Sequence, residues 1–246
     1  MTHLGPIIGQ ALWLFVRVVV EVIRQAFWVF AKDVLVEIRS PSRFIGVMFF
    51  AFAVIFMVAF ASNTTDVMRR QAGGVLWIGL LLASTRSLDQ SFAAELEHNA
   101  LEGQTLWPVH PTAIFFGKAL ANAVILIIVG TILTPLSIAM FDVTVRGSWL
   151  QMAGFIVLGS TALAAPGTLF TAITSQARGS SVLLPLLMFP LVVPVLMAAA
   201  RGTTLIFLPD PMDQSTAWLI ALVAFNVIHW PLAGLLFGRV VEGGTH

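Results

Sequence analysis

The chain has 246 residues, of which 58% are hydrophobic and 10% are charged, and its mean hydropathy is +0.94. Soluble globular domains carry about 25% charged residues, so this balance excludes that class and indicates an all-α integral membrane protein. A formal net charge of +1 argues against binding of nucleic acid. The absence of cysteine excludes a disulfide framework, a thiolate nucleophile and a Cys-based metal site.

The first predicted element is an amphipathic helix whose apolar side chains recur every three or four positions. These apolar residues are Leu12, Val16, Val19, Ile23, Phe27, Phe30, Val34 and Ile38. Arg17, Glu21 and Arg24 would each cost about 2.5–3.5 kcal/mol at the centre of a bilayer, so we do not expect this helix to span. We interpret residues 1–43 as a cytoplasmic interfacial helix. The alternative is that its apolar stripe is buried against the protein's own spans.

Six apolar stretches between residues 44 and 238 predict six membrane-spanning helices. They cover residues 44–61, 73–88, 115–141, 149–174, 182–200 and 218–237. We expect the second stretch to continue into the polar segment that follows it as one helix. The fourth carries small residues at four-residue intervals, which lets another helix approach closely. These residues are Ser160, Ala164, Thr168 and Ala172. No internal repeat is evident, so we expect one domain over residues 1–246.

The basic residues orient the spans. With the N-terminus in the cytoplasm, most of the 13 Lys and Arg fall on the cytoplasmic side, which is the bias seen in membrane proteins. These are Arg17, Arg24, Lys32, Arg39, Arg43, Arg86, Lys118, Arg178 and Arg239, against Arg69, Arg70, Arg146 and Arg201 outside. Both termini and residues 86–111 are therefore predicted in the cytoplasm. We expect Lys118 to extend its charge toward the headgroups.

Residues 86–111 form the one long polar interval between apolar runs. Its first part predicts a helix that ends at Glu102, because Gly103 suits the left-handed residue after a helix. Carboxylates at Glu97 and Glu102 oppose the helix macrodipole, so helix stability does not explain them. Contact with a basic partner is one explanation. A solvated face of a loop helix is the other.

Sequence motifs constrain the chemistry of the chain. It has no GxxxxGK[ST] loop, so we expect no enzyme activity and assign any ATP hydrolysis to a separate partner chain. His229 is the one histidine inside a predicted span and is either a haem ligand or substrate contact, or a packing residue bonded to Asn226 one turn earlier. Met188 and Met197 are weaker candidate ligands of haem iron. We expect no metal site.

Several segments resemble the CcmB family, the haem exporter permeases of bacterial cytochrome c maturation. They are KDVLVEIRSP at residues 32–41, Leu101 to Gly103, Pro108-Val109, Gly117-Lys118 and the run LLPLLMFPLVVPV at residues 183–195. The resemblance extends over nearly the whole chain. It implies a type 2 ABC exporter half-permease with six spans in the bacterial inner membrane.

The same resemblance implies partners and site residues. The partners are a second copy of the chain, a CcmA-like ATPase that binds ATP, CcmC-like and CcmD-like membrane proteins and, indirectly, a CcmE-like haem chaperone. Residues 86–111 then become a coupling segment that links ATP hydrolysis to delivery of haem, or to release of the haem-loaded chaperone, on the periplasmic side. The expected ATPase contacts are Glu95, Glu97, Leu101, Glu102, Gly103 and Pro108. The candidate substrate path is formed by Asn226, His229, Met188 and Met197.

Haem is the candidate substrate, and we expect no cofactor bound to the chain itself. Two other functions remain open. One is a mechanical scaffold that transmits ATPase closure without conducting a substrate. The other is a generic permease that exports a lipid or a drug.

Overall fold

The computed structural model describes residues 4–39, 42–61, 65–97, 110–176 and 183–243, and within these ranges the regular structure is entirely helical. The helices are α1 (Leu4–Arg39), α2 (Ser42–Ala61), α3 (Thr65–Glu97), α5 (Pro111–Phe141), α6 (Trp149–Gln176), α7 (Leu183–Phe207) and α8 (Gln214–Gly243). The all-α prediction is confirmed for this part of the chain.

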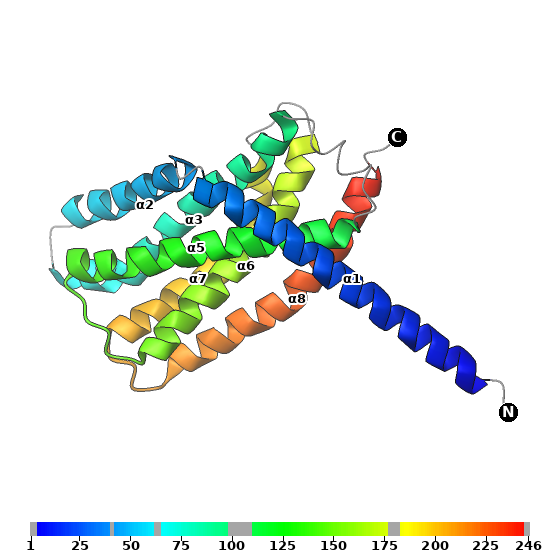
Figure 1. Ribbon diagram of the computed structural model, residues 1–246. Helices are drawn as coiled ribbons and strands as arrows, with labels where there is room; N and C mark the ends of the chain where they lie inside the picture. Colours follow the sequence, from blue (N-terminus) through cyan, green and yellow to red (C-terminus); the bar gives the residue numbers. More distant parts are fainter. Residues whose placement is uncertain (1–3, 40–41, 62–64, 98–109, 177–182, 244–246) are drawn as a thin grey trace.

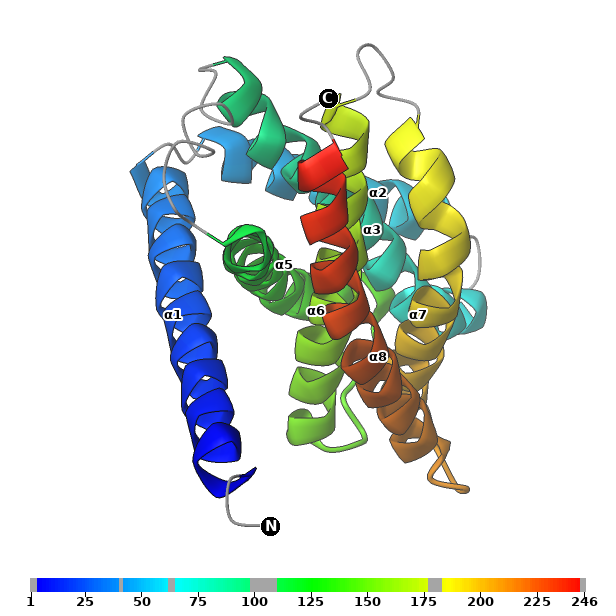
Figure 2. The ribbon, with the colours of Figure 1, turned by 90° about the vertical axis from the view of Figure 1, so that its right-hand side faces the viewer.

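Helices α2 to α8 form a bundle, and α1 crosses its outside obliquely, with its N-terminal part projecting beyond the other helices (Figure 1). Figure 2 shows α1 at one side of the molecule, next to α5 and away from α7. We call the end where α3 stops at Glu97 and α5 begins at Pro111 the proximal end. The opposite end, where residues 142–148 and 208–213 link helices, is the distal end.

Among the helices that the structure describes, five are long and apolar enough to cross a membrane, which makes this a multi-pass membrane protein. Their apolar segments are Phe44–Ala61, Pro111–Phe141, Trp149–Thr174, Pro190–Phe207 and Gln214–Arg239, and they match five of the six predicted spans. The remaining predicted span, residues 73–88, lies in α3, which is not among the five because polar residues flank its short apolar part. A sixth span therefore stays a prediction.

Helix α3 runs without a break from Thr65 to Glu97, so the prediction of one helix through residues 73–88 and into the polar interval is confirmed. It packs against α2, α5, α6 and α7. Leu76, Trp77 and Leu80 are at most 1% exposed, so the middle of α3 is enclosed by protein. The predicted helix end at Glu102 lies outside the described residues.

Helix α6 is the most deeply enclosed of the five apolar helices, with 72% of its segment buried. The predicted close approach is confirmed, because the small-residue stripe is 0–3% exposed; it consists of Ser160, Ala164, Thr168 and Ala172. Beside the stripe, a Cβ atom at Gly159 would lie 2.0 Å from the ring of Trp77, so α3 sits tightly against α6. Asn122 of α5 donates a hydrogen bond to Thr168 Oγ1 at 3.2 Å. The core is therefore built on α6.

The apolar stripe of α1 is not covered by the bundle. Its members are 39–71% exposed at Val16, Val19, Ile23, Phe27 and Ile38. Helix α1 packs on α5 through a different face, which includes the buried Ala26. The alternative in which the protein's own spans bury the stripe is therefore wrong for these residues. An apolar stripe open to the surroundings suits a helix that lies in a membrane interface, and that location stays a prediction.

Candidate coupling site and substrate-path residues

The structure places the predicted ATPase contacts at the proximal end only in part. Glu95 and Glu97 occupy the last turn of α3, where the backbone is helical. The other predicted contacts lie outside the described residues; they are Leu101, Glu102, Gly103 and Pro108. Contact with an ATPase therefore stays a prediction for all six residues.

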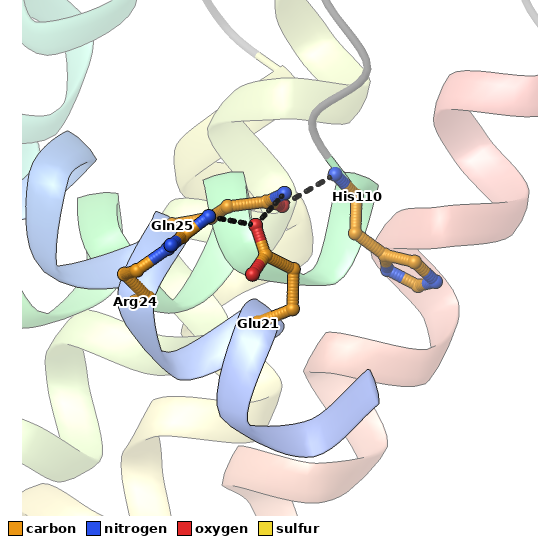
Figure 3. A network of polar contacts seen from close by, with 4 residues as sticks. All are labelled: Glu21, Arg24, Gln25 and His110. Carbon is orange, nitrogen blue, oxygen red and sulfur yellow. Dashed lines mark hydrogen bonds and ion pairs between the residues drawn. The ribbon is translucent and has the colours of Figure 1, made fainter. Parts of the chain in front are cut away.

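The chain re-enters the described structure at His110, and α1 holds it there (Figure 3). The backbone N–H of His110 donates to Gln25 Oε1 on α1 at 3.0 Å. Gln25 Nε2 in turn donates to Glu21 Oε1 at 3.2 Å, and Arg24 Nη2 donates to the same oxygen at 2.6 Å. His110 has extended backbone angles and forms the N-cap of α5. The end of the polar interval is thus tied to both α1 and α5.

The α1–α5 contact depends on a glycine and a buried ion pair. A Cβ atom at Gly117 would lie 2.6 Å from Val29 Cβ and 2.7 Å from the carbonyl oxygen of Ala26, so the missing side chain lets α1 approach. Lys118 is 1% exposed, and its Nζ lies 3.5 Å from Asp33 Oδ2. The prediction that Lys118 extends toward the headgroups is wrong, because α1 covers it.

Sequence reasoning missed Asp33 as a partner of Lys118. A buried ammonium group needs a nearby carboxylate or equivalent partners, since the cost of removing the charge from water is several kcal/mol. That rule, applied to a lysine within an apolar helix, points to a search for an acidic residue on a neighbouring helix. It does not by itself select Asp33, which lies 85 positions earlier.

Asn226 links α8 to α6 and makes no hydrogen bond with His229. Its Nδ2 donates to the carbonyl oxygens of Leu158 at 2.9 Å and Leu222 at 2.8 Å, and its Oδ1 accepts from Trp230 Nε1 at 3.0 Å. The predicted hydrogen bond between Asn226 and His229 is therefore wrong. The reason is that the amide of Asn226 is already used by the α6 backbone and by Trp230.

His229 is bonded within its own helix. Its Nδ1 lies 2.9 Å from the carbonyl oxygen of Phe225, which can only accept, so Nδ1 carries the proton in this contact. The imidazole also stacks on the Phe225 ring with a centroid distance of 3.6 Å. These contacts fit the interpretation of His229 as a packing residue.

The methionine candidates lie on α7. Met197 is 54% exposed and lines a cavity of about 530 Å³ whose other residues come from α2, α3 and α7. The side chain of Met188 lies outside the description. Because α8 contributes no residue to the Met197 cavity, Met197 and His229 do not share it. Within the described ranges, His, Asp and Glu form no group of three or more that could hold a metal ion.

A bundle of apolar helices joined by buried polar contacts defines the class, a multi-pass helical membrane protein. The chain matches the family model of the CcmB protein over residues 24–238. It is 31% identical over 202 residues to Heme exporter protein B of Rhodobacter capsulatus, which covers 78% of this chain and 92% of the relative. The chain belongs to the CcmB family.

Two further relatives have the same name. Heme exporter protein B of Pseudomonas aeruginosa is 25% identical over 76% of this chain and 83% of the relative. The protein of that name from Bradyrhizobium diazoefficiens is 27% identical over 82% of this chain and 91% of the relative. The family resemblance noted from the sequence is confirmed.

Proposed function

We propose that this chain is the permease subunit of an ABC transporter that exports haem across the bacterial inner membrane for c-type cytochrome biogenesis. The observation that carries the proposal is the CcmB family match, together with relatives named Heme exporter protein B. The five apolar helices support a role within the membrane. Because the chain lacks a phosphate-binding GxxxxGK[ST] loop, a separate CcmA-like chain binds and hydrolyses ATP.

The ATPase docks on the coupling segment, residues 86–111, on the cytoplasmic side. Support comes from how this segment is attached: it includes the end of α3 and leads at His110 into α5. Helix α3 packs against four bundle helices, and the Gln25–His110 bond ties the segment to α1. A displacement of the segment would therefore act on α3, α5 and α1 together.

Haem would pass at the contact between two copies of the chain, beside CcmC-like and CcmD-like proteins, and would reach a CcmE-like chaperone outside. Support comes from the closed interior of one copy, in which the α6 stripe is at most 3% exposed. The exposed Met197 is a candidate contact on such a path. The same closed interior favours a second candidate function, a scaffold that moves its partners without conducting haem.

Charge exchange in the coupling segment tests the ATPase contact. In one variant Glu95, Glu97 and Glu102 all become Arg; in a second they all become Gln. A control carries Glu242→Arg near the end of α8, outside the coupling segment. Loss of a partly desolvated charge pair costs about 2–5 kcal/mol, and sign reversal adds repulsion. We expect the Arg variant to copurify at least about 30-fold less ATPase than the wild type. The Gln variant should lie between the wild type and the Arg variant.

The readouts are copurified ATPase and the yield of c-type cytochrome at equal permease level. The Glu242→Arg control should retain both. Wild-type recovery of both quantities in the Arg variant would show that these carboxylates do not bind the ATPase. A strain without the chain that makes c-type cytochrome normally would instead contradict the proposed function as a whole.

A further inference from the structure

We propose that the distal end carries a binding site for an amphipathic dicarboxylate. Under the haem-exporting function proposed above, on which this assignment rests, the ligand is haem, bound by its two propionates. The site is a cavity of about 640 Å³ where the start of α3 meets the α5–α6 and α7–α8 links. Ligand pockets of small molecules and cofactors are about 300–1,000 Å³, so this volume is adequate. The two links that line the cavity lie at the distal end of the bundle, opposite the end where α3 stops at Glu97 (Figure 1).

The polar part of the lining is mostly charged. It consists of three arginines, two carboxylates and a threonine: Arg69, Arg70, Arg146, Asp66, Asp142 and Thr144. Arg69 is already engaged, because its Nη2 donates to Asp142 Oδ2 and so joins α3 to the end of α5. Within the described ranges, Arg70 and Arg146 form no ion pair with a carboxylate, and both are exposed. The cavity therefore has two guanidinium groups available for an anion.

These two arginines come from separate segments of the chain. Arg70 belongs to α3, and Arg146 belongs to the link between α5 and α6. The backbone N–H groups of Arg146 and Gly147 both donate to the carbonyl oxygen of Ile206, at 2.9 and 3.1 Å, which fixes the link against α7. Guanidinium groups bind carboxylates with two parallel hydrogen bonds. Two of them on separate segments suit a ligand with two carboxylates.

The rest of the lining is apolar and well anchored. Val143 and Phe207 are 5% and 2% exposed, and Leu208 and Pro209 extend this wall. The adjoining Asp210 accepts the backbone N–H groups of Gln214 at 3.0 Å and Ser215 at 2.8 Å, and so caps α8. An inorganic anion would use only the arginines. The apolar wall indicates a ligand whose carboxylates extend from an apolar body, as the propionates of haem extend from the porphyrin.

Binding of haem and of its dimethyl ester tests the site. The full-length protein is placed in nanodiscs of zwitterionic phosphatidylcholine, and haem or the ester is titrated while tryptophan fluorescence is recorded. The variants are Arg70→Gln and Arg146→Gln, each with a lysine counterpart that keeps the charge. The matched control is Arg239→Gln, an exposed arginine on α8 that lines neither this cavity nor the Met197 cavity.

We expect each Gln variant to weaken haem binding by about tenfold, the loss of one charge-assisted pair. Binding of the ester should not change, the Lys variants should restore much of the affinity, and Arg239→Gln should bind haem normally. Wild-type protein that binds the ester as tightly as haem would overturn the inference, as would an equal loss in the Arg239→Gln control or no binding of haem at all.

A lipid phosphate is the other source of an anion at this end. If anionic phosphatidylglycerol in the nanodisc abolishes the difference between wild type and the Gln variants, the arginines hold a headgroup and the inference is wrong. Failure of the site is distinguishable from failure of the proposed function, because the latter is judged by ATPase recovery and cytochrome c yield. A protein that passes those tests but lacks carboxylate-dependent binding has the function without this site.

Discussion

Lys118 shows at the scale of a single residue how this bundle accommodates a charge. Its side chain is 1% exposed within an apolar helix, and the Asp33 carboxylate lies 3.5 Å from the ammonium nitrogen. Asp33 also lies 3.2 Å from Lys32 Nζ, but Lys32 is half exposed. The two contacts of Asp33 therefore differ in solvation. Only the contact with Lys118 is removed from water.

We predict that Asp33→Asn destabilises the protein by about 1–3 kcal/mol, because it removes one carboxylate partner of a buried ammonium group. A double-mutant cycle with Lys118→Met should give a coupling energy of about 1–3 kcal/mol. The measurement is thermal or chemical unfolding in detergent. Lys32→Met is the matched control and should cost at most about 1 kcal/mol, as exposed ion pairs do. If the effects of Asp33→Asn and Lys118→Met on the free energy of unfolding are simply additive, the two side chains do not stabilise each other.

At the scale of elements, the structure rests on close helix contacts made by small residues. The α6 stripe follows from a four-residue repeat that is visible in the sequence, because residues four apart share one face of a helix. The α1–α5 contact at Gly117 does not follow in the same way. A glycine in a helix indicates a close approach but not which helix approaches, and here the partner is α1.

Gly117→Ala should loosen α1 from α5. The added Cβ would lie 2.6 Å from Val29 Cβ and 2.7 Å from a backbone oxygen of α1, so the helix itself has to shift. Overpacking of this kind costs about 1–3 kcal/mol. We expect faster amide hydrogen exchange across α1 with little change in α6. Gly46→Ala on α2 is the control, since nothing lies within 4 Å of a Cβ there. Equal exchange in the two variants would contradict the role of Gly117.

At the scale of the whole molecule, the two ends of the bundle differ in character. The proximal end bears the coupling segment and its bonds to α1, and the distal end bears the arginine-lined cavity. The distribution of Lys and Arg predicts that the proximal end lies in the cytoplasm. The opposite arrangement would put the coupling segment out of reach of an ATPase.

Single cysteines test this orientation without background, because the chain has no cysteine of its own. We predict that a cysteine at Thr144, in the distal link, reacts with a membrane-impermeant thiol reagent in intact cells. One at Gly243, at the end of α8, should react only after permeabilisation. Reaction at Gly243 in intact cells would show that the predicted topology is inverted. The coupling segment would then lie outside the cytoplasm and the arginine-lined cavity inside it, which would contradict both proposals.

The sequence by itself determined the membrane class, five of the spans, the continuity of α3 and the close approach at α6. Each of these depends on local composition or on the helical period, which a single stretch of chain contains. The sequence did not predict which polar side chains contact each other. The structure pairs Lys118 with Asp33, Asn226 with Trp230, and His229 with Phe225.

Only the tertiary structure decided which polar groups meet. Lys118 and Asp33 are 85 positions apart, and the distal cavity combines α3 with two separate links. The hydropathy of a span shows that it must be buried in lipid or protein, but it does not show which face meets which neighbour. That choice depends on how all the helices pack at once, because each small residue, charge and hydrogen-bonding group is satisfied only by a particular arrangement of its neighbours.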